Sequence, residues 1–109
     1  HTSKYVGVIK SKKSAAIDIE EIGPKALELN SKFMNKEETV KFNDNQSATI
    51  CWSAKECMFK MHQIGSVNFR KDLRVHSIKK DFVICFMFNQ RIKLNFEKFD
   101  NHVLLYYYE

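Results

Sequence analysis

The sequence predicts an α+β fold dominated by antiparallel β-structure: a small barrel or curved sheet of about six to eight strands with one amphipathic helix over residues 54–64. Three observations predict it. Short apolar or alternating runs, bounded by polar turn residues, recur along the chain. Only one stretch combines helical spacing with start and stop signals, and aromatic residues are abundant at 13%. The 109 residues form one domain, 1–109, which we expect to be a module of a larger protein.

Candidate strands and turns make up most of the first half of the chain. Residues 5–9 and 15–22 are apolar enough for two strands, and the lysine-rich segment 10–14 between them suits a turn. Residues 25–36 fit a short helix and a strand equally well. Residues 39–52 contain two alternating runs around Asn and Asp side chains that favour a turn. We therefore expect two hairpins before the helix.

Residues 54–64 have the pattern of an amphipathic helix. Ser53 and Glu56 have the spacing of a capping box, and Gly65 stands where a helix C-cap is expected. The apolar positions recur at intervals of three and four residues, which places one stripe against a sheet. These positions are Ala54, Cys57, Met58, Met61 and Ile64.

Residues 82–96 predict a β-hairpin whose register has two alternatives. A two-residue turn at 89–90 leaves one mixed aromatic and basic face open, whereas a three-residue loop at 89–91 turns the aromatic side chains into the core. Because burial of a Phe side chain contributes roughly 1.5–3 kcal/mol, we favour the three-residue loop. The side chains whose environment depends on this choice are Phe82, Phe86, Phe88, Arg91 and Lys93.

The remaining strands are expected at residues 67–69, 73–75 and 103–108. The last of these is rich in aromatic and branched side chains, and it is apolar enough to need a partner strand from this chain or from another. Its tyrosines, Tyr106, Tyr107 and Tyr108, are candidate interface residues.

The residues that usually carry catalysis or bind metals do not form a recognisable pattern. The histidines at 62, 76 and 102 lie on separate segments, and the adjacent carboxylates at 20–21 and 37–38 would point to opposite faces of a strand. Three cysteines form an odd set without a close pair, which favours buried, reduced thiols and an intracellular location, cytoplasmic or nuclear. We expect no enzymatic activity, no cofactor, no metal and no transmembrane segment.

Basic residues gather in a few segments of a chain whose net charge is +5. A lysine-rich turn between the first two strands is similar to the arrangement in pleckstrin-homology domains, and this loose resemblance implies binding of phosphoinositide headgroups. The family's closing helix with its Trp has no counterpart here, because the only Trp is Trp52. The candidate binding residues are Lys10, Lys12, Lys13, Arg70, Lys71, Arg74, Lys79, Lys80, Arg91 and Lys93.

These patterns favour a non-enzymatic interaction domain or scaffold module that binds another protein, by strand addition or as a homodimer. The alternative is polyanion binding through the basic loops, with single-stranded nucleic acid or an anionic lipid as the partner.

Overall fold

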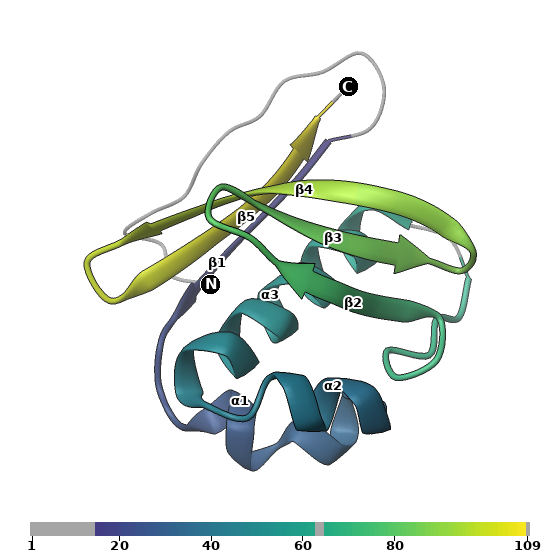
Figure 1. The fold of residues 1–109 in the computed structure, drawn as a ribbon. Helices are drawn as coiled ribbons and strands as arrows, with labels where there is room; N and C mark the ends of the chain where they lie inside the picture. Colours follow the sequence, from purple (N-terminus) through teal and green to yellow (C-terminus); the bar gives the residue numbers. More distant parts are fainter. Residues whose placement is uncertain (1–14, 63–64, 109) are drawn as a thin grey trace.

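A computed structural model describes residues 15–62 and 65–108, which form an α+β fold (Figure 1). Five antiparallel strands make one sheet in the order β1-β5-β4-β3-β2. The strands are β1 (Ala15–Glu21), β2 (Leu73–Ile78), β3 (Phe82–Met87), β4 (Gln90–Phe99) and β5 (His102–Tyr108). The helices are α1 (Lys25–Glu28), the 3₁₀ turn η2 (Asn30–Lys32), α2 (Lys36–Lys41) and α3 (Asn45–His62).

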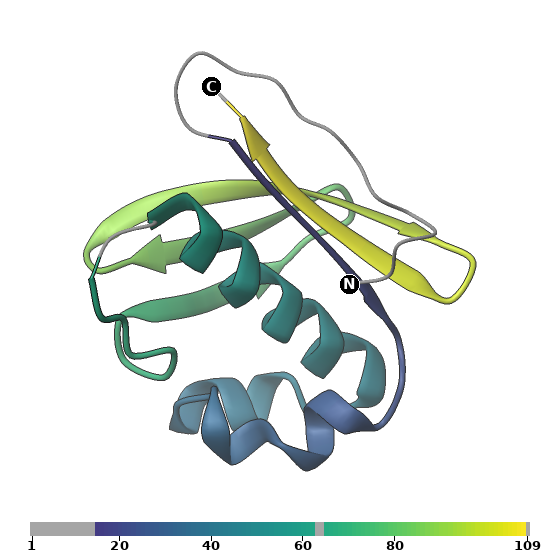
Figure 2. The ribbon, with the colours of Figure 1, turned by 180° about the vertical axis from the view of Figure 1, so that it is seen from behind.

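All the described helices lie between β1 and β2 in the sequence; α1 packs on α3, and α2 lies against the edge strand β2. The long helix α3 lies across one face of the sheet (Figure 2). We call this the inner face and the opposite one the outer face. The α+β class is confirmed, but the barrel is not, because the described sheet is open between β1 and β2. The expected strand 5–9 and the lysine-rich turn 10–14, on which the resemblance to pleckstrin-homology domains rests, lie outside the described residues.

The expected hairpin over residues 39–52 is wrong, because both of its runs are helical. Asp44 caps α3: the Ser47 backbone N–H donates to Asp44 Oδ1 at 2.7 Å, which lowers the pKa of that carboxyl. The helix begins at Asn45 rather than Ala54, so Ser53 is not a cap but a fully buried residue in mid-helix. Branched residues such as Ile50 suit strands locally, but their apolar spacing continues that of the helix, and burial against the sheet overrides the local preference.

The ambiguous segment 25–36 is helical over α1 and η2, whereas the strand expected at 67–69 is absent from the described structure. The other two strands expected in the second half of the chain are confirmed. The strand expected at 73–75 is confirmed as part of β2. The strand expected at 103–108 is confirmed as β5, which finds its partners within the chain by pairing with β1 and β4.

The three-residue loop that we favoured in the β3–β4 hairpin is wrong. Met87 pairs with Gln90, so the turn has two residues as in the alternative, but it lies at Phe88 and Asn89 instead of 89–90, with Phe88 at a positive φ of 57°. This two-residue turn places the Phe82 and Phe86 side chains on the outer face. It turns the alternate side chains of both strands into the core. Those buried side chains are Val83, Cys85, Ile92, Leu94 and Phe96.

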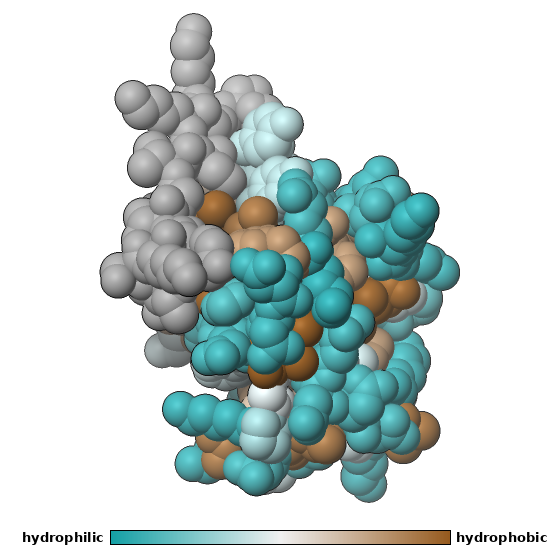
Figure 3. Space-filling model, turned by 90° about the vertical axis from the view of Figure 1, so that its left-hand side faces the viewer, coloured by the Kyte–Doolittle hydropathy of each residue, from teal (hydrophilic) through white to brown (hydrophobic). Residues whose placement is uncertain are grey.

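The core lies between the inner face of the sheet and α3. Ala48, Cys51, Ala54, Cys57 and Met58 line the buried side of the helix with no exposed surface. On the side of the molecule seen in Figure 3, apolar surface is divided into small patches by hydrophilic side chains. No helix in the described part of the chain is long and apolar enough to span a membrane.

A buried ion pair joins α3 to α2. Lys55 is fully buried, and its Nζ donates to Glu38 Oε1, to the Phe33 carbonyl and to the Phe69 carbonyl, each at 2.7 Å. The other carboxylate oxygen of Glu38 accepts the Val75 backbone N–H of β2 at 2.6 Å. Both charges therefore have hydrogen-bonded partners, which a buried ion pair requires.

Replacement of Lys55 should destabilise the fold strongly. Lys55→Met leaves the Glu38 carboxylate buried without its counter-ion, so we expect a loss of about 3–5 kcal/mol in the free energy of unfolding, measured by urea denaturation. The added change Glu38→Gln should restore part of the loss. The exposed Lys36→Met is the control and should change stability by less than about 0.5 kcal/mol. A Lys55→Met protein as stable as the wild type would contradict this role.

Candidate functional site

Acidic and basic side chains meet between β1 and α3. Asp18 and Glu20 lie two residues apart on β1, so both point toward α3 from the inner face. Glu56 and Lys60 lie about one turn apart on α3. We call these four residues the carboxylate site. They place three carboxyl groups and one ammonium group where the strand and the helix pack together.

Asp18 is the most fixed member of the carboxylate site, because its side chain is buried and both oxygens accept hydrogen bonds. Ser53 Oγ donates to Oδ2 at 2.8 Å, and Lys60 Nζ donates to Oδ1 at 3.0 Å. Lys60 also donates to the Ile17 carbonyl at 2.9 Å. The donors belong to α3 and the acceptors to β1, so the packing of helix on strand sets the orientation of the carboxylate.

The other two carboxyl groups are difficult to ionise. Burial, the hydrogen bond with Asp18 and the charge of Asp18 together raise the pKa of Glu20 to about 8. Burial and then the charge of Asp18 raise the pKa of Glu56, which Lys60 offsets in part. At neutral pH Glu20 therefore holds a proton, since its burial and the neighbouring charge of Asp18 both disfavour the ionised form. A carboxyl group with a raised pKa beside other charged groups is typical of functional sites.

A cleft of about 700 Å³ opens beside the carboxylate site, and Glu20 forms part of its wall. Aromatic rings form the apolar wall: the centroid of Trp52 lies 5.2 Å from that of Phe33 and 5.8 Å from that of Phe69. Three cationic residues also line the cleft, namely Lys25, Lys32 and Arg70. The cleft thus offers apolar and cationic surface next to a carboxylate group.

The basic residues predicted from the sequence lie in several places, although Arg70, Lys71 and Arg74 line one depression together with Lys36. Arg74, Arg91 and Lys93 project from the outer face, where β2 and β4 flank β3. Arg70 and Lys71 lie in the loop before β2, and only Arg70 reaches the cleft. Lys79 and Lys80 follow β2, and the predicted residues outside the described part of the chain are Lys10, Lys12 and Lys13.

The predicted aromatic residues divide between the two faces. The Tyr107 side chain packs against the core on the inner face. Phe88 lies in the β3–β4 turn with its ring centroid 5.2 Å from that of His62, away from the other aromatic residues. The aromatic residues on the outer face are Phe82, Phe86, Tyr106 and Tyr108.

The cysteines are buried and free, as the sequence analysis expected. Burial raises the pKa of Cys57 to about 12 and that of Cys51 and Cys85 well above its usual value. The thiols therefore stay protonated at neutral pH and do not provide a nucleophile.

Sequence reasoning missed the carboxylate site. It weighed Glu20 with its neighbour Glu21, which does point to the other face, but not with Asp18 two residues away. It also treated Glu56 as part of a capping box, because the start of α3 was placed too late. Two patterns in the sequence could have indicated this site: the alternation in Asp18-Ile19-Glu20 and the spacing of Glu56 and Lys60.

No protein-family model matches this sequence, and no curated protein matches it.

Replacement of Glu20 should make stability less dependent on pH. The folded Glu20 carboxyl keeps its proton up to a pKa of about 8, whereas the unfolded chain loses it near the ordinary value of 4.5. The folded state therefore binds more protons between these values, and stability falls as pH rises from about 5 to 8. In Glu20→Gln the thermal midpoint should fall less over this window and exceed that of the wild type at pH 8 by a few degrees, on the order of 3–6 °C.

The exposed Glu37→Gln serves as the control, and its midpoint should follow the wild-type curve across the same buffers. Parallel curves for Glu20→Gln and wild type would show that Glu20 ionises normally, contrary to this interpretation.

Proposed function

We propose that this protein binds a divalent cation and a phosphate-bearing ligand together at the carboxylate site. The observation that carries the proposal is the meeting of Asp18, Glu20 and Glu56 beside Lys60. Carboxylate oxygens are the side-chain ligands that Mg²⁺ prefers, and it usually keeps only one or two of them while phosphate and water complete the shell. A cation would also offset the burial and the repulsion by Asp18 that keep Glu20 protonated.

The proposal requires the ligand to complete the coordination shell. In the described residues, no three His, Cys, Asp or Glu side chains are arranged to hold a metal ion by themselves. Asp18 Oδ1 and Oδ2 already accept hydrogen bonds from Lys60 and Ser53, so a cation would rely on Glu20 and Glu56 for further oxygens. This favours a shared site for cation and phosphate over a metal site built by the protein alone.

The cationic residues nearby support phosphate as the ligand chemistry. The Nζ of Lys60 donates to Asp18 and to the Ile17 carbonyl, which leaves its third N–H without an acceptor among the described residues. Its side chain is 37% exposed, so a ligand can reach it. Arg70 lines the adjacent cleft, whose Trp52 wall suits an apolar or aromatic part of the same ligand.

Cation and lysine together favour a phosphate ester or diphosphate as the ligand. A bound divalent cation would neutralise phosphate charge, and a lysine adds a second positive charge. We therefore propose that the ligand carries a diphosphate group, and the expectation from the sequence that the protein is not an enzyme stays a prediction.

The expectation that a partner protein binds by adding a strand to the sheet has less support. β5 already lies between two strands, and of the two edge strands, β1 and β2, the edge of β2 is engaged by helix side chains. Glu38 accepts the Val75 N–H, and Lys41 Nζ donates to the His76 carbonyl at 2.9 Å. Such side chains protect an exposed edge from pairing.

Calorimetric titration with MgCl₂ and sodium pyrophosphate tests the proposal. We expect pyrophosphate to bind in the presence of Mg²⁺ and at least tenfold more weakly with EDTA. Glu20→Gln and Glu56→Gln should weaken Mg²⁺-dependent binding at least tenfold, because each removes an anionic oxygen ligand. Titration in buffers of different ionisation enthalpy at pH 7 should show a proton released by the wild type and not by Glu20→Gln.

Lys60→Met should weaken pyrophosphate binding in the presence of Mg²⁺ at least about threefold, since it removes the ammonium group that meets the phosphate. Glu37→Gln is the matched control and should bind as the wild type does. Binding of pyrophosphate that is insensitive to EDTA, or that survives both glutamate substitutions, would rule out a shared cation and phosphate site.

A further inference from the structure

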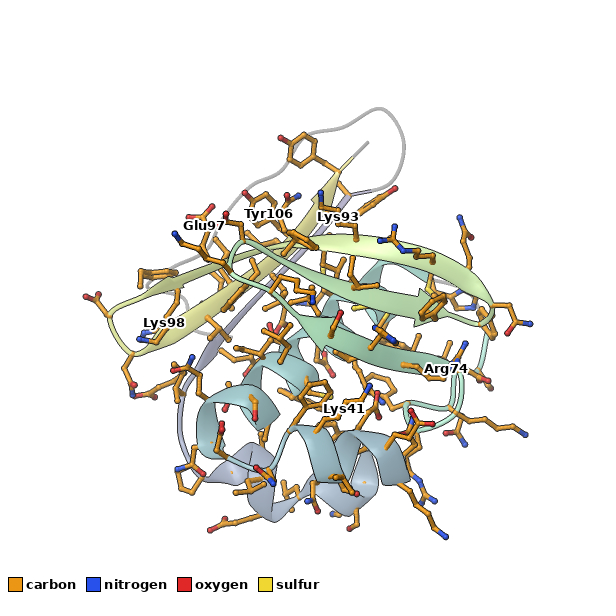
Figure 4. The ribbon with its side chains drawn as sticks, viewed as in Figure 1. Lys41, Arg74, Lys93, Glu97, Lys98 and Tyr106 are labelled. Carbon is orange, nitrogen blue, oxygen red and sulfur yellow. The ribbon has the colours of Figure 1, made fainter. Side chains whose placement is uncertain are left out.

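We infer that the outer face of β2, β3 and β4 binds an acidic segment of a partner protein. This surface is separate from the carboxylate site, which lies on the inner face, so the inference goes beyond the proposed function. It follows from the two-residue β3–β4 turn, which brings basic and aromatic side chains together on the outer face of the sheet (Figure 4).

Cations alternate with aromatic rings across the three strands. Arg74 of β2 and Arg91 of β4 are the cross-strand neighbours of Phe86 of β3. The Arg74 guanidinium lies 5.1 Å from the Phe86 ring centroid. One step along, the Lys93 ammonium lies 4.5 Å from the ring centroid of Phe82. These contacts hold the cationic groups against the sheet, which lowers the conformational entropy lost on binding.

The positive charge of this surface is not neutralised by described carboxylates. The salt bridges among the described residues are Lys55–Glu38 and Lys60–Asp18, both on the inner side. Glu97, an acidic residue on the outer face, lies further along β4 and accepts a hydrogen bond from Tyr106 at 3.0 Å. The surface therefore presents the charges of Arg74, Arg91 and Lys93 to an anionic partner.

The arrangement of the rings favours an acidic protein over a nucleic acid. Single-stranded nucleic acids bind by stacking bases on open aromatic faces, and here Lys93 and Arg74 occupy one side of the Phe82 and Phe86 rings. Arg, Tyr and Phe beside a buried aliphatic residue, here Ile84 at 8% exposure, are the composition of a protein interface. Tyr108, which is 57% exposed at one margin, adds a further aromatic anchor.

Fluorescence anisotropy with a labelled 18-residue peptide of alternating Glu and Leu pairs tests this inference, with a 20-nucleotide oligo-dT as the competing probe; both lengths are about those that span one small domain. The wild type should bind the acidic peptide, and replacing its Glu residues by Gln should abolish binding. The double variant Arg74→Glu with Arg91→Glu should raise the dissociation constant at least tenfold, because it places two like charges against the peptide.

Lys98→Glu is the matched control, since Lys98 is an exposed residue at the far end of β4, on the other side of the strand (Figure 4). It should change the dissociation constant by less than about threefold, as expected for a charge outside the contact surface. The inference is overturned by failure of the wild type to bind the peptide, by equal losses in Lys98→Glu and the double variant, or by tighter binding of oligo-dT than of the peptide.

Discussion

The arrangement of the helical layer depends on the buried pair formed by Lys55 and Glu38. A buried ammonium group requires an acceptor for each of its N–H groups, and the three found here belong to α2, to the segment before it and to the loop before β2. Two of the acceptors are the carbonyls of Phe33 and Phe69, whose rings form walls of the cleft. The buried Lys55 ammonium therefore also holds the backbone of two residues that line the cleft.

The helix α3 connects this constraint to the proposed chemistry. Lys55 lies on one side of the helix, and its next neighbour in the sequence, Glu56, lies on the side that meets β1. Ser53 and Lys60 then orient Asp18 from that same side. The same helix therefore positions both the buried ion pair and the carboxylate site. A site built from helix and strand residues is held more precisely than one built from loops.

Local sequence patterns predicted the sheet better than the helices. The strand at the start of the described chain, the strand β5 and the hairpin between β3 and β4 follow from alternation and apolar content. The first half of α3 was not predicted as a helix, because Thr49, Ile50 and Trp52 have strand preference and only packing against the sheet makes them helical. The turn at Phe88 and Asn89 was missed for a related reason: a Phe at positive φ contradicts turn propensity, and pairing of the two strands outweighs it. The carboxylate site could be predicted only in part, since the pairing of Asp18 with Glu20 is local but their approach to Glu56 is tertiary.

The place of β5 in the sheet has a consequence for the nascent chain. β1 carries Asp18 and Glu20, yet its described strand partner is β5, which follows about 80 residues later. During synthesis β1 and α3 emerge from the ribosome long before the strand that fixes β1 in the sheet. β1 therefore gains its described strand partner only when β5 has been released, so a shorter nascent chain carries Asp18 and Glu20 on a strand that is not yet paired with β5.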